Sequence, residues 1–69
     1  MSVSYKKLWH LLIDKEMDRK DLEKISGVSH YTMTRIGKDK DVNFEARRKI
    51  CLALNCKIDD IMEYGSEIN

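Results

Sequence analysis

Hydrophobic residues recur at intervals of three and four along most of this 69-residue chain, which places them on one face of an α-helix. The first such face comprises Tyr5, Leu8, Trp9 and Leu12. Ser4 is a suitable N-cap for this helix, and Lys15 and Glu16 close it. No run of four or more residues alternates as a strand does, and proline, which breaks helices, is absent. The pattern therefore predicts helices throughout.

Two short amphipathic segments, joined at Gly27, follow between Asp18 and Lys38. Asp18 is the expected N-cap of the first segment, in which Leu22 and Ile25 are expected to face inward. Glycine adopts left-handed backbone conformations without steric cost, so Gly27 is expected to end this helix.

Ser29 is the expected N-cap of the third helix, which ends near Gly37 and is followed by a charged loop over residues 38–42. The inward edge of this helix is formed by Val28, Met33 and Ile36. Its outward edge carries His30, Tyr31, Thr34, Arg35 and Lys38. A polar and basic edge of this kind favours a helix that contacts an anionic partner such as DNA.

A fourth helix is expected to begin near Asn43 and to end at Asn55, a residue type that tolerates left-handed geometry. Its apolar side is formed by Ala46, Ile50, Ala53 and Leu54. A short fifth helix, capped by Asp59, is expected to return Ile61 and Met62 to the core. The pattern thus predicts a compact all-α bundle of five helices, which forms a single domain over residues 1–69.

The segment from residue 18 to residue 38 has the length and the central glycine of a helix-turn-helix, in which the second helix projects as a ridge. A helix is about 10–12 Å across, which matches the roughly 12 Å major groove of B-DNA. The spacing of the inward apolar residues on both sides of the turn is the spacing expected for two helices that pack into one core. A helical hairpin that binds nothing is the alternative interpretation of this segment alone.

The net charge of +1 conceals an uneven distribution of charged residues. Residues 1–57 contain all 13 Lys and Arg against 8 Asp and Glu, a surplus of 5, whereas residues 58–69 contain 4 acidic residues and no basic one. A basic body of this kind is compatible with nucleic-acid binding, although asymmetry of this size is common in small helical domains.

Other function classes find little support. No apolar run approaches the roughly 18 residues of a membrane span, and no secretion leader is expected. Cys51 and Cys56 are too few for a disulfide scaffold, so reduced thiols in the cytoplasm are expected. With His10 and His30 they form no CxxC or HxxxH spacing, so no metal site is expected. Nor is a catalytic triad, a phosphate loop or a paired-carboxylate cleft recognisable, so we expect no enzyme, no cofactor and no small-molecule substrate.

Residues around the turn and in the last third of the chain resemble a known family. The matching segments are Leu22-x-x-Ile25-Ser26-Gly27-Val28-Ser29, Met33-x-x-Ile36, Ile50-x-x-Ala53-Leu54-Asn55 and Ile58-Asp59-Asp60-Ile61. Over about residues 4–64, the chain is similar to the Cro/repressor-type (XRE) helix-turn-helix family. The resemblance implies a lambda-repressor-like DNA-binding domain of five helices that acts in transcription, usually in bacteria, phages or mobile elements.

Two positions depart from the family pattern. Arg19 stands where the family often has Gln, and Glu23 stands where it prefers a small residue. A charged side chain at the crossing of the two helices is tolerated if its carboxylate reaches solvent, and this is the expectation for Glu23.

The resemblance also implies roles for the outward side chains. The base-facing positions are occupied by His30, Tyr31, Thr34 and Arg35. Arg35 is the expected specificity residue because a guanidinium can donate two hydrogen bonds to guanine O6 and N7. Phosphate contacts are expected from Arg19 and Ser29, which lie at helix N-termini, and from Lys38 and Lys40, which follow the third helix. For the two lysines, a solvated loop is the alternative.

The sequence therefore predicts a sequence-specific, DNA-binding transcriptional regulator, expected to be a repressor, that inserts its third helix into the major groove of double-stranded DNA. Residues 58–68 are the expected surface if the protein forms a homodimer, and no membrane partner is expected. The competing interpretation is a protein-interaction module, such as an antitoxin or a repressor antagonist. Its expected surface contains Trp9, Met62, Tyr64 and Ile68.

Overall fold

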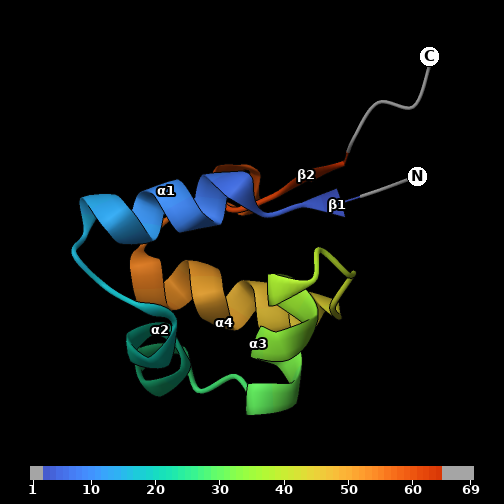
Figure 1. Cartoon of the computed structure of the whole chain (residues 1–69), viewed down its shortest axis with the longest axis horizontal. Helices are drawn as coiled ribbons and strands as arrows, with labels where there is room; N and C mark the ends of the chain where they lie inside the picture. The colour runs from blue at the N-terminus through green and yellow to red at the C-terminus, as the bar shows by residue number, and fades with distance from the viewer. Residues whose placement is uncertain (1–2, 65–69) are drawn as a thin grey trace.

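The computed structural model describes residues 3–64, which form four α-helices, one turn of 3-10 helix and two short strands. The helices are α1 (Lys6–Asp14), α2 (Arg19–Ser26), α3 (His30–Gly37) and α4 (Phe44–Leu54), and the turn is η1 (Ile58–Asp60). The strands are β1 (Val3–Ser4) and β2 (Glu63–Tyr64). In Figure 1, α4 lies in the middle, with α1 on one side of it and with α2 and α3 on the other. No helix among residues 3–64 has the length and the apolar composition needed to cross a membrane.

The prediction of a fifth α-helix is wrong, because only the single turn η1 lies between α4 and β2. Asp59 lies inside this turn and does not cap it; instead, the backbone N–H of Lys57 donates to Asp60 Oδ2 at 3.0 Å. The burial of Ile61 and Met62 is confirmed, since they are 0% and 3% exposed. Both side chains enter the core directly after the turn, and the chain then extends to form β2, which leaves no room for a longer helix.

The N-terminal end of α1 also differs from the prediction. Its N-cap is Tyr5, and Ser4 belongs to β1. Strands β1 and β2 pair antiparallel, with Val3 opposite Tyr64 and Ser4 opposite Glu63. Strands of two residues are too short to show an alternation of polar and apolar side chains, so the sequence pattern does not predict them.

Other helix ends form as the sequence predicts. Asp18 Oδ1 accepts a hydrogen bond from the backbone N–H of Asp21 at 2.8 Å, and Asp21 Oδ2 accepts one from the N–H of Asp18 at 3.1 Å. The backbone N–H of Asp21 holds the pKa of Asp18 below its ordinary value. Ser29 and Asn43 cap α3 and α4 through their side-chain oxygens, and Gly27 ends α2 in the left-handed region at φ +79°. These local hydrogen bonds and the left-handed Gly27 fix where α2, α3 and α4 begin and where α2 ends.

The core between the helices is centred on six side chains without solvent exposure. They are Tyr5, Leu8, Leu22, Ile36, Ile50 and Ile61. The expected inward position of Ile25 is wrong, since its side chain is 51% exposed. Helix α2 instead buries Leu22 completely and Ser26 in part, and Ser26 Oγ donates to the carbonyl oxygen of Leu22 at 2.6 Å. Ala53, also expected inside, is half-buried.

Alkaline pH is expected to destabilise this core through Cys51, a thiol on α4 that is 8% exposed. Burial raises the pKa of the Cys51 thiol to about 11. An exposed thiol has a pKa near 8.5, so the stabilisation is fully present below about pH 8.5. It is then lost as the pH rises through the folded value of about 11.

Urea unfolding followed from neutral to strongly alkaline pH measures this loss. A Cys51→Ala variant should show a shallower alkaline decline than the parent protein. Some decline should persist in the variant, because burial also raises the pKa of Tyr5. An unchanged slope in Cys51→Ala would contradict the prediction.

Candidate nucleic-acid interface

Helices α2 and α3 meet at the tight turn around Gly27 and form the helix-turn-helix that the sequence predicts. Helix α3 turns Met33 and Ile36 into the core, where they are 4% and 0% exposed. Its opposite edge is open to solvent over His30, Tyr31 and Thr34, with Arg35 half-buried beside them. The structure therefore brings the four expected base-facing residues onto one face of one helix.

Arg35 is held by the loop that follows α3. Its Nε and Nη2 atoms donate to the carbonyl oxygen of Asp41 at 2.9 and 2.7 Å. A guanidinium has five N–H donors, so three of them, including both on Nη1, are not used by this contact. The side chain is thus oriented before any partner arrives, and it retains donors for a second contact.

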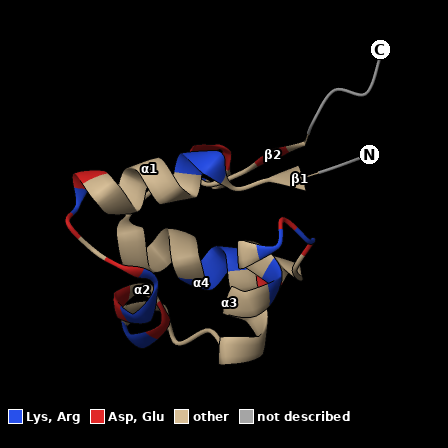
Figure 2. Cartoon of the chain, viewed as in Figure 1, with Lys and Arg blue, Asp and Glu red and all other residues tan. Residues whose placement is uncertain are grey.

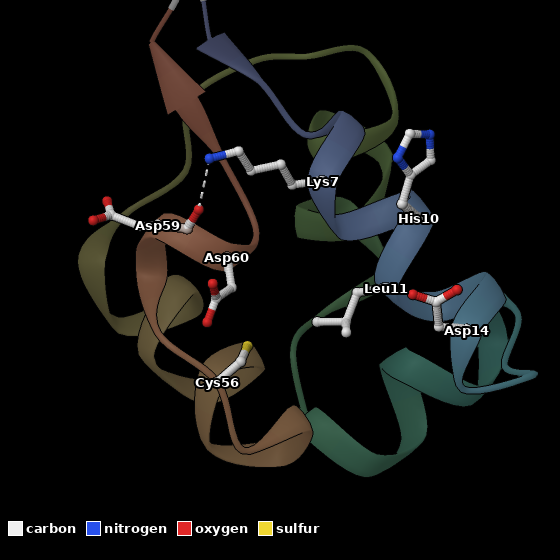
Figure 3. Close-up of a pocket in the computed structure, with 7 residues that line it drawn as sticks. All are labelled: Lys7, His10, Leu11, Asp14, Cys56, Asp59 and Asp60. Atoms are coloured by element: carbon white, nitrogen blue, oxygen red, sulfur yellow. Dashed lines mark hydrogen bonds between the residues drawn. The ribbon is translucent and has the colours of Figure 1, made fainter.

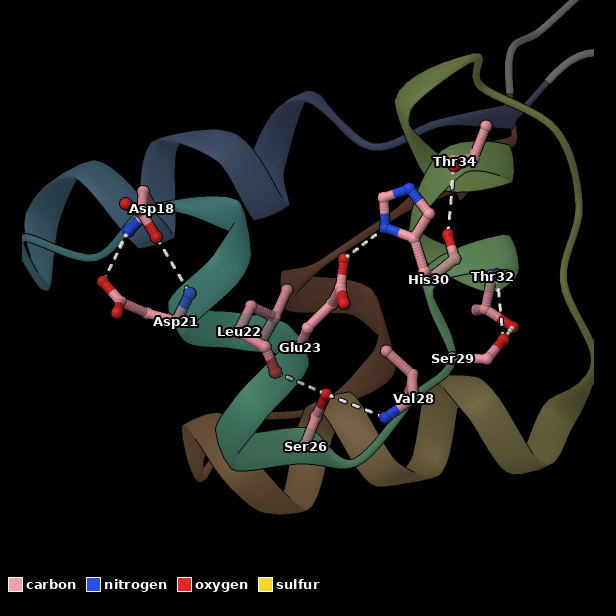
Figure 4. Close-up of polar contacts among 10 residues, drawn as sticks. All are labelled: Asp18, Asp21, Leu22, Glu23, Ser26, Val28, Ser29, His30, Thr32 and Thr34. Carbon is pink, nitrogen blue, oxygen red and sulfur yellow. Dashed lines mark hydrogen bonds and ion pairs between the residues drawn. The ribbon is translucent and has the colours of Figure 1, made fainter.

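His30 makes a contact that the sequence analysis missed. Its Nδ1 atom lies 2.9 Å from Glu23 Oε2 across the helix-turn-helix (Figure 4). The imidazole is 85% exposed and the Glu23 side chain is 27% exposed, so the carboxylate reaches solvent in part, with His30 as its partner. Thr34 Oγ1 donates to the carbonyl oxygen of His30 at 3.0 Å, which draws this hydroxyl toward its own helix.

Arg19 packs against its neighbours at the start of α2. Its guanidinium carbon lies 4.0 Å from the centroid of the Trp9 ring, a cation–π distance. Its Nη1 atom also passes so close to Gly37 that a Cβ at that position would lie 2.9 Å away. The residue that departs from the family pattern therefore ties α1, α2 and the end of α3 together, and a side chain at position 37 would push it aside.

The other three expected phosphate-binding residues are all exposed. Ser29 accepts a hydrogen bond from the backbone N–H of Thr32 at 3.1 Å and donates to Thr32 Oγ1 at 3.0 Å. Its hydroxyl is therefore used locally, as the cap of α3. Lys38 follows α3 directly, and Lys40 lies two residues farther along the loop.

Side chains from both ends of the described chain anchor this loop. The buried Tyr5 donates from its hydroxyl to the carbonyl oxygen of Lys40 at 2.9 Å, and its backbone N–H donates to Asp39 Oδ1 at 3.3 Å. The Tyr64 hydroxyl donates to Asp41 Oδ1 at 3.3 Å and accepts from Arg47 Nη1 at 3.4 Å. Because most of these contacts join residues more than 20 positions apart, no local sequence signal identifies them.

The basic residues are not evenly spread over the described part of the chain. In Figure 2, they appear at the start of α1, along α2, in the loop after α3 and in the first half of α4, while most of α1 and α3 is uncharged. Arg47, Arg48 and Lys49 form the α4 group. A recognition helix on which Arg35 is the one Lys or Arg, with further cations around it, is compatible with base contacts at the centre and phosphate contacts around them.

A hollow of about 350 Å³ lies on another side of the domain, between α1 and η1 (Figure 3). Its lining includes His10, Asp14 and Asp60, and Lys7 Nζ crosses its rim to donate to the carbonyl oxygen of Asp59 at 3.1 Å. Within residues 3–64, no group of three His, Cys, Asp or Glu side chains is close enough to hold a metal ion. The hollow is separate from the exposed edge of α3.

The surface expected for a protein partner is only partly available. Met62 is 3% exposed and belongs to the core, so its expected surface position is wrong. Trp9 is half-buried beneath Arg19, while Tyr64 is 50% exposed. Ile68 lies outside the described residues, as do residues 65–68 of the expected dimer segment.

Comparison with known proteins agrees with this geometry. Residues 7–67 match the family model of the Cro/C1-type HTH DNA-binding domain. The crystal structure of the transcriptional regulator VanUg (form II) is similar, with a TM-score of 0.86 and 44% sequence identity over 90% of this chain and 83% of that chain. A search of the curated proteins found no match. The family match spans the helix-turn-helix and most of the remaining chain, and this chain therefore belongs to the Cro/C1-type helix-turn-helix family of DNA-binding domains.

Proposed function

We propose that the protein is a sequence-specific transcriptional regulator, acting as a repressor, that places α3 in the major groove of double-stranded DNA. The observation that carries this proposal is the exposed edge of α3, whose polar side chains lie opposite a fully packed inner edge. Membership of a DNA-binding family and the similarity to VanUg, a transcriptional regulator, support it.

The base-facing residues in this proposal are His30, Tyr31, Thr34 and Arg35. Arg35 is the principal reader, because the donors that Asp41 leaves unused match the O6 and N7 acceptors of guanine. Thr34 and Tyr31 offer a methyl group and a ring to the thymine methyl or to a sugar.

The phosphate-contacting residues in this proposal are Arg19, Ser29, Lys38 and Lys40. Helix N-termini attract anions through their unpaired N–H groups, which favours the positions of Arg19 and Ser29. The lysines lie on an anchored loop beside α3, where each can neutralise one phosphate.

Selection of bound duplexes from a random library, followed by anisotropy titrations at several salt concentrations, tests the proposed function. A sequence-specific regulator should enrich one site and should bind it at least about a thousand times more tightly than random duplex. Affinity for both should fall as salt rises. Failure to enrich any sequence, or a salt-independent affinity, would contradict the proposal and would favour the protein-interaction module.

Replacing Lys38 by Ala should weaken binding to all duplexes by a similar factor and should reduce the slope of log affinity against log salt by about 1. The reason is that a lysine ammonium on a phosphate releases one counterion and reads no base. Lys57→Ala is a matched control, because Lys57 is an exposed lysine next to η1, away from α3. Equal effects of the two substitutions would remove Lys38 from the interface.

We also propose that the protein binds its site as a homodimer, through residues 58–68. The described part of this segment contains β2, which has a neighbour only on its β1 side within residues 3–64. A second copy can pair with its other edge by two-fold symmetry. Two recognition helices then meet major grooves about 34 Å apart. Sedimentation equilibrium with and without the selected duplex measures this association.

A further inference from the structure

The contact between Glu23 and His30 joins α2 to the first residue of α3, at the N-terminal end of the proposed DNA-binding face. Glu23 Oε2 lies 2.9 Å from His30 Nδ1. The carboxylate is largely covered, with 27% of its side chain exposed, whereas the imidazole is 85% exposed. Most of the Glu23 side chain is therefore covered, while its partner ring is open to solvent. Figure 4 shows the second ring nitrogen, Nε2, on the side of the ring that points away from Glu23.

This arrangement restricts where the imidazole carries its proton. An ionised carboxylate is only an acceptor, so Nδ1 must be the donor in this hydrogen bond. In a neutral imidazole, one nitrogen donates and the other accepts. When the imidazole is neutral and its proton is on Nδ1, the exposed Nε2 carries a lone pair and no hydrogen.

We propose that Glu23 is a positioning residue that holds His30 in the Nδ1–H form, so that Nε2 acts as a hydrogen-bond acceptor toward the DNA. This inference rests on the proposed function, because it requires α3 to lie in the major groove. An acceptor there is matched by the exocyclic amino groups of adenine (N6) and cytosine (N4). It is opposed by guanine O6 and N7 and by thymine O4, which are themselves acceptors. The base facing His30 is therefore adenine or cytosine.

The chain's departure from a small residue at position 23 thus acquires a function in base selection. With Ala at this position, the imidazole loses its carboxylate acceptor and can present either nitrogen as its donor. Gln at this position has nearly the shape of Glu, yet its amide NH₂ can donate to Nδ1 and leave the proton on Nε2. Glu23→Gln therefore allows the exposed atom to change from acceptor to donor without changing the size of the side chain.

Long-range ¹H–¹⁵N NMR spectra of the DNA-free protein at about pH 8.5, where a free imidazole is neutral, test the protonation directly. His30 should show a protonated Nδ1 and an unprotonated Nε2, and the exposed His10 on α1 provides an internal reference. The Glu23→Gln and Glu23→Ala variants should both show a larger share of Nε2–H. Thermal melts establish that the variants are folded. A wild-type His30 that is protonated at Nε2 would overturn the proposal.

Base preference provides the second test. At the same pH of about 8.5, the selected duplex is varied to all four bases at the position that loses discrimination in His30→Ala. The wild type should bind adenine or cytosine there about 5- to 10-fold better than guanine or thymine, in keeping with about 1 kcal/mol for one hydrogen bond. Glu23→Gln should reduce or reverse this ratio. In a His30→Ala background, the Glu23→Gln change should have no effect on the base ratio at this position.

The two tests separate the inference from the function on which it rests. If the Glu23→Gln protein keeps the wild-type base ratio, Glu23 has only a structural role and the inference is wrong. If no duplex is selected by the wild type, the proposed function fails and base selection by His30 fails with it. The NMR spectra then still decide whether Glu23 controls the protonation of His30.

Discussion

Replacing Leu22 by Ala should lower the free energy of unfolding by about 2–5 kcal/mol. Leu22 is 0% exposed and lies where α2 contacts α4, so its removal leaves a cavity among side chains that cannot easily move to fill it. A domain of this length has a total stability of roughly 3–10 kcal/mol. The variant should therefore be largely unfolded at moderate urea concentrations, as measured by circular dichroism.

Ile25 provides a matched control on the same helix. It is also a branched aliphatic residue, three positions away, but its side chain is 51% exposed. Ile25→Ala should therefore change stability by no more than about 0.5 kcal/mol. Similar losses in the two variants would show that α2 is rotated relative to the orientation described above.

Replacing Arg35 by Ala should weaken binding to the selected duplex by about 1–3 kcal/mol, which is roughly a 5- to 150-fold loss, and should relax base preference at one position. The effect is expected to be large because the Asp41 carbonyl already orients the guanidinium, so the wild type loses little side-chain entropy on binding. Anisotropy titrations against single-base variants of the duplex measure both quantities.

An Arg35→Lys variant separates base reading from charge. Lysine retains the positive charge but lacks the fork that donates to a carbonyl and to a base together. Binding to random duplex should therefore be nearly unchanged, while preference for the selected site falls. Thermal melts identify any loss of stability from the missing Asp41 contact. If the Arg35→Ala protein binds every duplex as the wild type does, the proposal that α3 reads the bases is wrong.

Local chemistry made much of the fold predictable. Asp18, Ser29 and Asn43 cap helices because their side-chain oxygens reach the backbone N–H three residues away, an interaction contained within one turn. Gly27 and Asn55 end helices in the left-handed region, at φ +79° and +55°, for a similarly local reason. The edge of α3 was predictable because helical spacing alone determines which of its side chains share a face.

Features that depend on distant residues were not predictable in this way. The pairing of β1 with β2, and the hydrogen bond from Tyr5 to the carbonyl of Lys40, join segments that only the completed fold brings together. The exposure of Ile25 follows from how α2 is rotated about its axis against α4. The spacing of apolar residues alone does not determine this rotation. Glu23 was recognised as unusual, but its partner His30 is seven residues away across the turn.

The anchored loop after α3 has a consequence for the speed of DNA recognition. Tyr5 holds the backbone carbonyl of Lys40, and Tyr64 holds the side chain of Asp41. In the proposed complex, a loop that keeps this arrangement on DNA adds no slow folding step after the first encounter. The rate of association is then limited by diffusion and by electrostatic attraction between the basic residues and the phosphates. Such a protein can sample many sites along a chromosome quickly, and it distinguishes among them by how long it stays.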